Sequence, residues 1–184
     1  RVFLLKSDKP HAFALAVVTK RNIVLSFRGT HNYDDVVTDI SVVPEPWNPP
    51  NNRFSLHKMG IESALWVHGG FYSSYMALRP QLVQILSEHL TRRSQHRAVL
   101  LTGHSLGGAL AVLATFDLAT FCDEYSNLRP RELQLYTFGA PRVGLADFAT
   151  AFAHELAGHT CVRVFTRKDP IACETGHGRG AQGQ

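Results

Sequence analysis

The segment Ala98-Val99-Leu100-Leu101-Thr102-Gly103-His104-Ser105-Leu106-Gly107-Gly108-Ala109 gives the strongest indication of the architecture. Its first part, 98–102, is an almost unbroken apolar run, which is typical of a buried strand. From Ser105 to about Phe121 the chain is apolar on nearly every side of a helix, and such a helix must be buried. A strand, a sharp glycine turn and a buried helix in direct succession predict part of a β-α-β unit.

Strand and helix patterns alternate on both sides of this segment. Helices are expected over 78–90 and 146–156, and a loop is expected over the proline- and asparagine-rich residues 44–54. This order predicts an α/β fold with a mostly parallel sheet and helices on both faces. Arg21-Asn22 predicts a tight turn between the first two strands. Strands are expected over 12–18, 23–27, 133–138 and 161–165, with a further short strand at 41–43.

Length and composition fit one globular domain. The chain has 184 residues, 45% of them hydrophobic, and a net charge of +4. That apolar share excludes a disordered chain, and no apolar run reaches the roughly 18 residues of a membrane span, so an integral membrane protein is excluded. The basic residues are scattered, which disfavours nucleic-acid binding.

The two ends of the chain qualify this interpretation. The chain opens apolar, with no signal-peptide pattern, and residues 175–184 form a glycine-rich tail that we expect to be disordered. We therefore expect 1–184 to be a single domain that is incomplete at both ends. A soluble or peripheral protein fits the composition, and the compartment stays open.

The cysteines and histidines do not form a metal-binding pattern. Cys122, Cys161 and Cys173 are odd in number and widely spaced, with no C-x-x-C. One disulfide or three thiols are both compatible with this spacing. No H-E-x-x-H occurs among the ten histidines, so the sequence predicts neither a metal nor a cofactor.

Gly103-His104-Ser105-Leu106-Gly107 matches the pattern Gly-x-Ser-x-Gly. A strand that ends in this pattern and leads into a helix is the setting of a nucleophile elbow, whose serine has a strained backbone. The two outer glycines let strand and helix approach closely. The helix N-terminus favours negative charge beside the serine. Ser105 is therefore the predicted catalytic nucleophile.

A serine nucleophile needs an acid behind its base, and Asp169 is the best candidate for that acid. Asp169 follows the expected strand 161–165, at the sheet edge where Ser105 also emerges. Asp123, Glu124 and Asp147 instead follow or belong to helices. The alternative for Asp169 is a turn-forming aspartate before proline.

Two backbone groups are the expected oxyanion donors. The N–H of Leu106 follows the nucleophile directly, as the elbow requires. Thr30, after the expected strand 23–27, can offer its N–H and its hydroxyl. Gly29 beside it lets this loop approach the substrate. An ordinary turn at the end of a strand is the alternative for Thr30.

Four motifs together resemble the class 3 lipases, the fungal-type triacylglycerol lipase family. The resemblance covers the chain from about Val17 to Pro170. It implies an α/β-hydrolase fold and cleavage of carboxylic esters of lipids, without a cofactor. It also implies that Ser105 is the nucleophile, Asp169 the triad acid, and Thr30 with Leu106 the oxyanion hole. The motifs are Phe27-Arg28-Gly29-Thr30, Val67-His68-Gly69-Gly70-Phe71-Tyr72, Gly103-His104-Ser105-Leu106-Gly107-Gly108 and Phe138-Gly139-Ala140-Pro141-Arg142-Val143-Gly144.

The catalytic histidine has no match in this sequence. The resemblance implies a base several tens of residues after the acid, whereas 184 − 169 = 15 residues follow Asp169. His177 is the one histidine among them, and its position does not match. His68 and His104 lie in the motifs but are not the base of the family. We expect the base beyond Gln184, so inactivity of this chain by itself stays open.

Residues 32–40 have the pattern of a short amphipathic helix. Asn32 can cap it, and Tyr33, Val36, Val37 and Ile40 share one face. This helix either packs its apolar face on the core or resembles a lipase lid that opens at a lipid surface. The sequence does not choose between these two.

The leading functional hypothesis is a serine ester hydrolase that acts on lipid esters at a lipid–water interface. Peripheral contact with a membrane or a lipid droplet is compatible with this hypothesis. A phospholipase or a feruloyl-type esterase would use the same residues. An inactive lipid-binding or interaction domain is the alternative outside enzymes. Acyl-chain preference and oligomeric state stay open.

Overall fold

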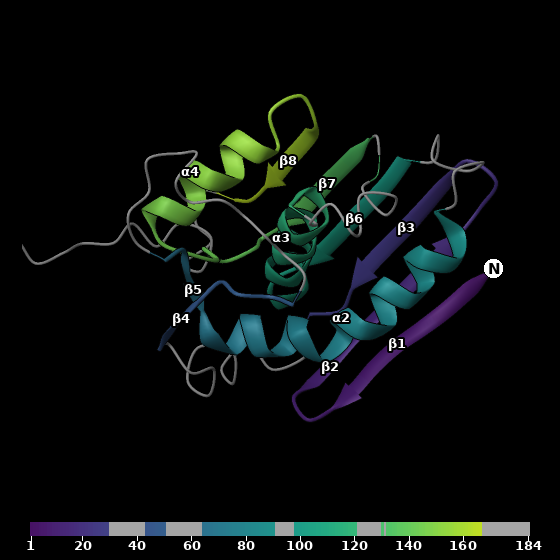
Figure 1. Cartoon of the computed structure of the whole chain (residues 1–184), viewed down its shortest axis with the longest axis horizontal. Helices are drawn as coiled ribbons and strands as arrows, with labels where there is room; N and C mark the ends of the chain where they lie inside the picture. The colour runs from purple at the N-terminus through teal and green to yellow at the C-terminus, as the bar shows by residue number, and fades with distance from the viewer. Residues whose placement is uncertain (30–42, 51–63, 91–97, 121–129, 131, 167–184) are drawn as a thin grey trace, which may run out of the picture.

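The computed structural model describes residues 1–29, 43–50, 64–90, 98–120, 130 and 132–166 (Figure 1). Strands and helices alternate along most of this part of the chain, as the sequence predicted. The elements are β1 (Val2–Asp8), β2 (His11–Val18), β3 (Asn22–Phe27), β4 (Pro44–Pro46), β5 (Trp66–His68), α2 (Gly69–His89), β6 (Ala98–His104), α3 (Leu106–Ala119), β7 (Leu133–Phe138), α4 (Ala146–Glu155) and β8 (Thr160–Val164).

The main sheet has six strands in the order β1-β2-β3-β6-β7-β8. β1, β2 and β3 are antiparallel neighbours, whereas β3, β6, β7 and β8 run parallel. The mostly parallel sheet that the sequence predicted is therefore present. Because parallel strands end at the same edge of the sheet, the chain leaves β3, β6, β7 and β8 on one side.

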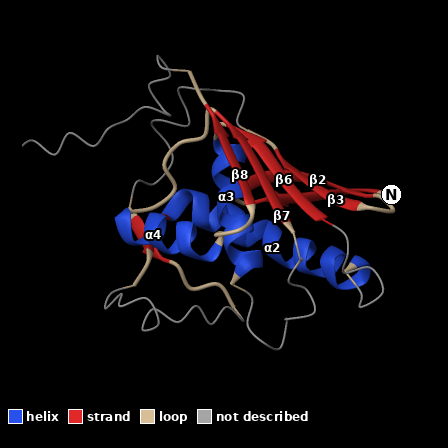
Figure 2. Ribbon diagram, turned by 90° about the horizontal axis from the view of Figure 1, so that it is seen from above, coloured by secondary structure: helices blue, strands red, loops and turns tan. Residues whose placement is uncertain are grey.

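One face of this sheet is covered by helices. Leu25 pairs with Leu101, and Leu101 pairs with Leu135, so the three side chains line one buried face. Figure 2 shows α2, α3 and α4 together on one side of the sheet. Within the described residues, helices thus cover one face of the sheet, and the sequence-based prediction of helices on both faces is not met there.

The opposite face exposes apolar side chains. Leu4 and Leu15 pair across β1 and β2 with 60% and 46% of their surface exposed. Strands covered on one side only alternate buried and exposed residues, and β2 and β3 have this pattern. Further exposed apolar side chains on this face are Val2, Phe138, Val162 and Val164.

An aromatic cluster fills the space between the helices and the segment 43–50. Trp47 is the centre of this cluster, and its ring centroid lies 5.5 Å from that of Phe116 and 6.2 Å from those of Tyr75 and Phe148. Such offset and tilted ring contacts add to the burial of apolar area. The cluster joins α2, α3 and α4 into one layer against the sheet.

The structure contains short or irregular strands that the sequence did not predict. β1 was not predicted, and the expected loop 44–54 is wrong for Pro44–Pro46, which form β4. β1 is stabilised by pairing with β2, and β4 by pairing with β5. Neither sequence alternates regularly between apolar and polar residues. α2 begins at Gly69, earlier than the expected 78. Ser41 and Val42 of the expected strand 41–43 lie outside the described residues.

The tight turn expected at Arg21-Asn22 is confirmed. The hydroxyl of Thr19 accepts hydrogen bonds from the N–H groups of Arg21 (3.2 Å) and Asn22 (2.9 Å). This side-chain cap satisfies backbone donors in the connection between β2 and β3.

Candidate active site at the end of β6

Ser105 occupies a strained position between β6 and α3. Its backbone angles are φ 53° and ψ −126°, and among the described residues it is the one non-glycine residue with positive φ. A side chain disfavours this conformation, so surrounding contacts must hold it in place. The strained serine that the Gly-x-Ser-x-Gly pattern predicted is thus present.

Glycines on both sides of Ser105 make this turn possible. A Cβ on Gly103 would lie 2.3 Å from the carbonyl of Gly107, and a Cβ on Gly107 would lie 2.2 Å from the carbonyl oxygen of Phe27. Side chains at either position would overlap backbone atoms that cannot move aside. The close approach of strand and helix that the sequence predicted is confirmed.

Backbone hydrogen bonds hold the turn on both sides. The N–H of Ser105 donates to the carbonyl oxygen of Phe138 at the end of β7, over 2.9 Å. The carbonyl oxygen of Ser105 accepts the N–H groups of Gly108 (2.9 Å) and Ala109 (3.2 Å). Ser105 is therefore fixed to both the neighbouring strand and the first turn of α3. It is 3% exposed.

The N-terminus of α3 supplies positive potential beside Ser105. Leu106 is the first residue of this helix, whose first turn carries no acidic side chain. The first N–H groups of a helix have no intrahelical acceptor, and the helix dipole adds a partial positive charge there. This arrangement can stabilise negative charge that develops on an atom attacked by Ser105.

Gly29 packs directly against the turn. A Cβ on Gly29 would lie 2.7 Å from the carbonyl oxygen of His104. The glycine is thus required for contact with the β6–α3 turn, whereas an approach to the substrate was predicted from the sequence. Thr30 follows Gly29 in the chain and lies outside the described residues.

The other predicted site residues also lie outside the described part of the chain. These are Asp169, His177 and the expected helix 32–40. β8 ends at Val164 and runs parallel to β6 through β7, so the chain leaves it at the edge of the sheet that carries Ser105. Figure 1 shows the arrowheads of β6, β7 and β8 pointing the same way.

The motifs around residues 67–72 and 139–144 pack against each other. Val67 and Gly144 form an antiparallel bridge, and the N–H of His68 donates to the carbonyl oxygen of Val143 over 2.8 Å. The ring of His68 stacks on Phe71 with centroids 4.0 Å apart, and burial lowers the pKa of this histidine. These contacts give His68 a structural role.

A buried polar network joins α2 to α3. Arg79 Nε donates to Asp117 Oδ2 over 2.7 Å, and the Tyr75 hydroxyl donates to the same oxygen over 2.5 Å. Arg79 also donates to the carbonyl oxygen of Pro50. Burial and the charge of Asp117 raise the pKa of Tyr75, so its hydroxyl keeps the proton.

The sequence did not predict this network, although it contained one signal of it. Asp117 is a single carboxylate in a helix that is otherwise apolar, and a buried carboxylate requires a partner. Its partner could not be chosen from the sequence, because Arg79 lies 38 residues away.

A metal site, a disulfide and a membrane-spanning helix are absent from the part of the chain that the structure describes. No group of His, Cys, Asp and Glu side chains in these residues is arranged to hold a metal ion. Cys161 is not in a disulfide, and Cys122 and Cys173 lie outside the described residues. None of the described helices combines the length and the apolar character needed to cross a bilayer.

Comparison with known proteins gives the family. The family model for class 3 lipases matches residues 24–176. The chain belongs to the class 3 lipase family. The resemblance inferred from the four motifs is therefore confirmed.

Related proteins extend this assignment. This class 3 lipase family member is 35% identical to a lipase of Rhizopus niveus over 80% of its length, covering 31% of that protein. It is 32% identical to phospholipase A1-II 1 of Oryza sativa subsp. indica over 74% of its length, covering 35% of that protein. The chain thus spans about a third of these relatives.

A solved structure supports the same family. The crystal structure of a lipase from Rhizopus microsporus var. chinensis superposes with a TM-score of 0.75 at 26% identity, over 98% of this chain and 56% of that one. The chain has the α/β-hydrolase fold of these fungal lipases. Within that fold, the turn at Ser105 is the position where a nucleophile elbow is expected.

Proposed function

We propose that this chain carries the nucleophile of a serine ester hydrolase that cleaves carboxylic esters of lipids through an acyl-enzyme. The positive φ of Ser105 between β6 and α3 is the observation that supports this most strongly. Gly103 and Gly107 account for the close approach of strand and helix, but they do not account for a residue with a side chain at the strained position between them. Strain that the surroundings maintain favours a functional role.

In the proposed reaction the Ser105 hydroxyl attacks the ester carbonyl while a general base takes its proton. The tetrahedral oxyanion accepts hydrogen bonds from the N–H of Leu106 and from Thr30. The alcohol then leaves with a proton from the base, and water releases the fatty acid by the same route. The location of Leu106 at the first turn of α3 supports its part in this scheme.

Asp169 is the proposed acid that orients the base. It follows the parallel strand β8 in the chain, two strands from β6 in the sheet. A carboxylate there would hold a histidine in the correct tautomer and stabilise its charged form. His177 does not match the family position and is not proposed as that histidine.

Labelling with a fluorophosphonate tests the nucleophile directly. The reagent forms a covalent bond with an activated serine, and peptide mapping of the full chain should locate it at Ser105. Ser105→Ala should remove the label, whereas Ser87→Ala should retain it. Ser87 is a matched control because it is exposed on α2, with its hydroxyl bonded to Gln84. Labelling that survives Ser105→Ala would refute the proposal.

A phospholipase is the second candidate, and the similarity to a rice phospholipase A1 favours it over a feruloyl-type esterase. Both lipid hydrolases would use Ser105, so the substrate series decides between them. Hydrolysis of triacylglycerol emulsions should exceed hydrolysis of phosphatidylcholine and feruloyl esters by the same preparation. An unlabelled Ser105 in folded protein would instead favour a non-catalytic lipid-binding domain.

A further inference from the structure

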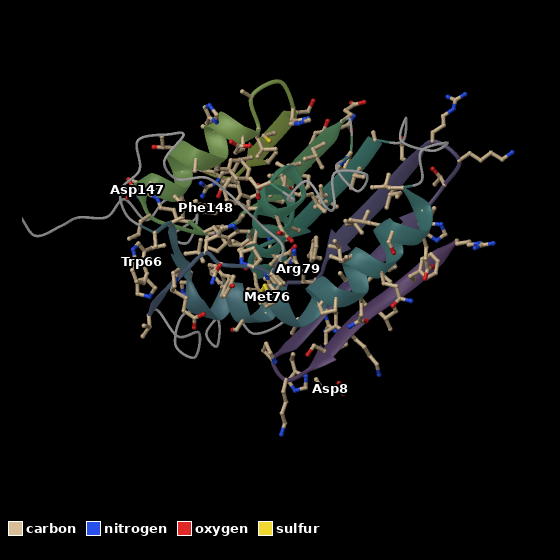
Figure 3. All side chains as sticks on the ribbon, viewed as in Figure 1. Asp8, Trp66, Met76, Arg79, Asp147 and Phe148 are labelled. Carbon is tan, nitrogen blue, oxygen red and sulfur yellow. The ribbon has the colours of Figure 1, made fainter. Side chains whose placement is uncertain are left out.

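An open apolar cavity lies between α4, β5 and the β7–β8 end of the sheet. Its volume is about 800 Å³, within the range of sites that hold small molecules. Phe148 and Phe152 of α4 form one wall, and Leu135 and Cys161 of neighbouring strands form another. Figure 3 labels Trp66 and Phe148 at this end of the molecule. Ser105 is not among the lining residues that the structure describes.

The charged groups around this cavity have one sign. Arg142 and Arg163 line it, and the described lining contains no aspartate or glutamate. Arg163 donates to the carbonyl oxygen of Ala140 over 2.8 Å, which fixes the guanidinium beside the loop that follows β7. Arg142 is exposed in the same loop. An apolar cavity with guanidinium groups at its border suits an anion with an apolar body.

We propose that this cavity binds a single long-chain fatty acid anion, with its alkyl chain along α4 and its carboxylate at Arg142. A long alkyl chain matches the aliphatic and aromatic walls, where its burial removes apolar surface from water. A guanidinium pairs well with a carboxylate at a border that water can still reach. This binding site requires no turnover and does not depend on the chemistry proposed for Ser105.

Trp66 provides a built-in reporter for binding. The chain has two tryptophans, and Trp66 lines the cavity with 38% of its surface exposed, whereas Trp47 is buried in the aromatic cluster. An alkyl chain that enters the cavity should displace water from the Trp66 ring. The emission of Trp66 should then shift to shorter wavelength on binding, and Trp66→Phe should remove the shift.

The experiment titrates the Ser105→Ala chain with palmitate below its critical micelle concentration, followed by tryptophan emission and calorimetry. Ala149→Phe places a bulky side chain in the cavity and should weaken binding about tenfold or more. Thr150→Phe is the matched control, because Thr150 is the next residue of α4, is exposed, and does not line the cavity. Thr150→Phe should leave the affinity unchanged.

The carboxylate is tested separately. Hexadecanol has the same chain without the charge and should bind about tenfold more weakly than palmitate. Arg142→Gln should bring the two affinities together, while circular dichroism confirms that the variant is folded.

Three results would overturn the proposal. Equal affinities of Ala149→Phe and Thr150→Phe would show that the alkyl chain lies elsewhere. Equal binding of palmitate and hexadecanol by the unmodified cavity would remove the role of Arg142. The third result is a dimer in sedimentation that Ala149→Phe dissociates, together with no binding of palmitate. It would assign the cavity to contact with a second copy of this chain. Fluorophosphonate labelling of Ser105 is independent of all three.

Discussion

Arg79 and Asp117 form a buried ion pair that joins α2 to the helix beginning after Ser105. Arg79 Nε lies 2.7 Å from Asp117 Oδ2, with side-chain exposures of 9% and 0%. Burial alone would lower the pKa of Arg79, but the hydrogen bond and charge of Asp117 outweigh this and raise it. Arg79 therefore keeps its proton inside the protein, and its contact with Asp117 fixes the two helices relative to each other.

Removing one partner of this ion pair should lower the free energy of unfolding strongly. Replacing the whole buried network with apolar side chains should lower it much less. Asp117→Ala leaves the Arg79 charge without its buried partner, and we expect a loss of about 3–5 kcal/mol in the free energy of unfolding. Arg79→Met and Asp117→Leu combined with Tyr75→Phe remove both charges and the hydroxyl that would lose its acceptor, and this triple variant should recover most of that loss. Urea denaturation measures both values. A triple variant as unstable as Asp117→Ala would contradict this interpretation.

The packing of the β6–α3 turn predicts that Gly107 tolerates no side chain. Gly107→Ala places a Cβ 2.2 Å from the carbonyl oxygen of Phe27, and relief of that overlap should cost more than about 2 kcal/mol. Gly158→Ala is the control, because Gly158 has φ +88° and no heavy atom within 4 Å of the added Cβ. Its cost should be backbone strain alone, about 1 kcal/mol. Similar thermal stabilities would argue against the overlap.

The one-sided covering of the sheet predicts very different costs for two neighbouring leucines. Leu25 is fully buried beneath the helices, whereas Leu15 on the adjacent strand is 46% exposed on the other face. Leu25→Ala should cost about 2–5 kcal/mol. Leu15→Ala should cost about 1 kcal/mol or less. Chemical denaturation compares the two, and a large cost at Leu15 would mean that this face is covered in the protein.

The environment of His68 predicts a loss of stability in acid. Burial lowers its pKa, so below the ordinary value of about 6.5 the unfolded chain binds the proton more readily than the folded one. The stability from the neutral ring is full above that value and is lost as the pH falls below it. The position of His68 before the N-terminus of α2 further disfavours a cation.

Urea midpoints at neutral pH and at pH about 5 measure this effect. His68→Gln should reduce the difference between the two midpoints. His154→Gln, at an exposed histidine of α4, should leave the difference as in the unsubstituted chain. If His68→Gln keeps the full acid effect, other groups cause it.

The local sequence pattern was sufficient to predict those elements that consist of one dense run of apolar residues. β6 and α3 lie close to their predicted bounds, because each element is apolar enough to require burial by itself. β4 was missed because its backbone groups are satisfied by β5, about 20 residues further along the chain, whereas β1 was missed because its own sequence lacks a regular apolar–polar alternation, although its partner β2 follows directly. The start of α2 was missed because Gly69 and Gly70 have low helix propensity, and packing against Val43 and Glu45 compensates for it.

The candidate site also has one part that a local sequence pattern predicts and another part that depends on residues far apart in the chain. The serine, its glycines and the following helix are consecutive, so their chemistry can be inferred from one pattern. The Tyr75–Arg79–Asp117 network could not be inferred, because nothing in the sequence indicates which distant cation meets Asp117. Asp169 and Thr30 remain predictions from their positions after strands.

The amino-acid sequence by itself determined that Ser105 stands between a buried strand and a buried helix, because the glycine spacing and apolar runs around it are local. Only the tertiary structure decided which face of the sheet the helices cover, which charges meet in the interior and where the apolar cavity lies. These features depend on contacts between residues far apart in the chain. Their energies come from burial and pairing in three dimensions, which no short segment encodes alone.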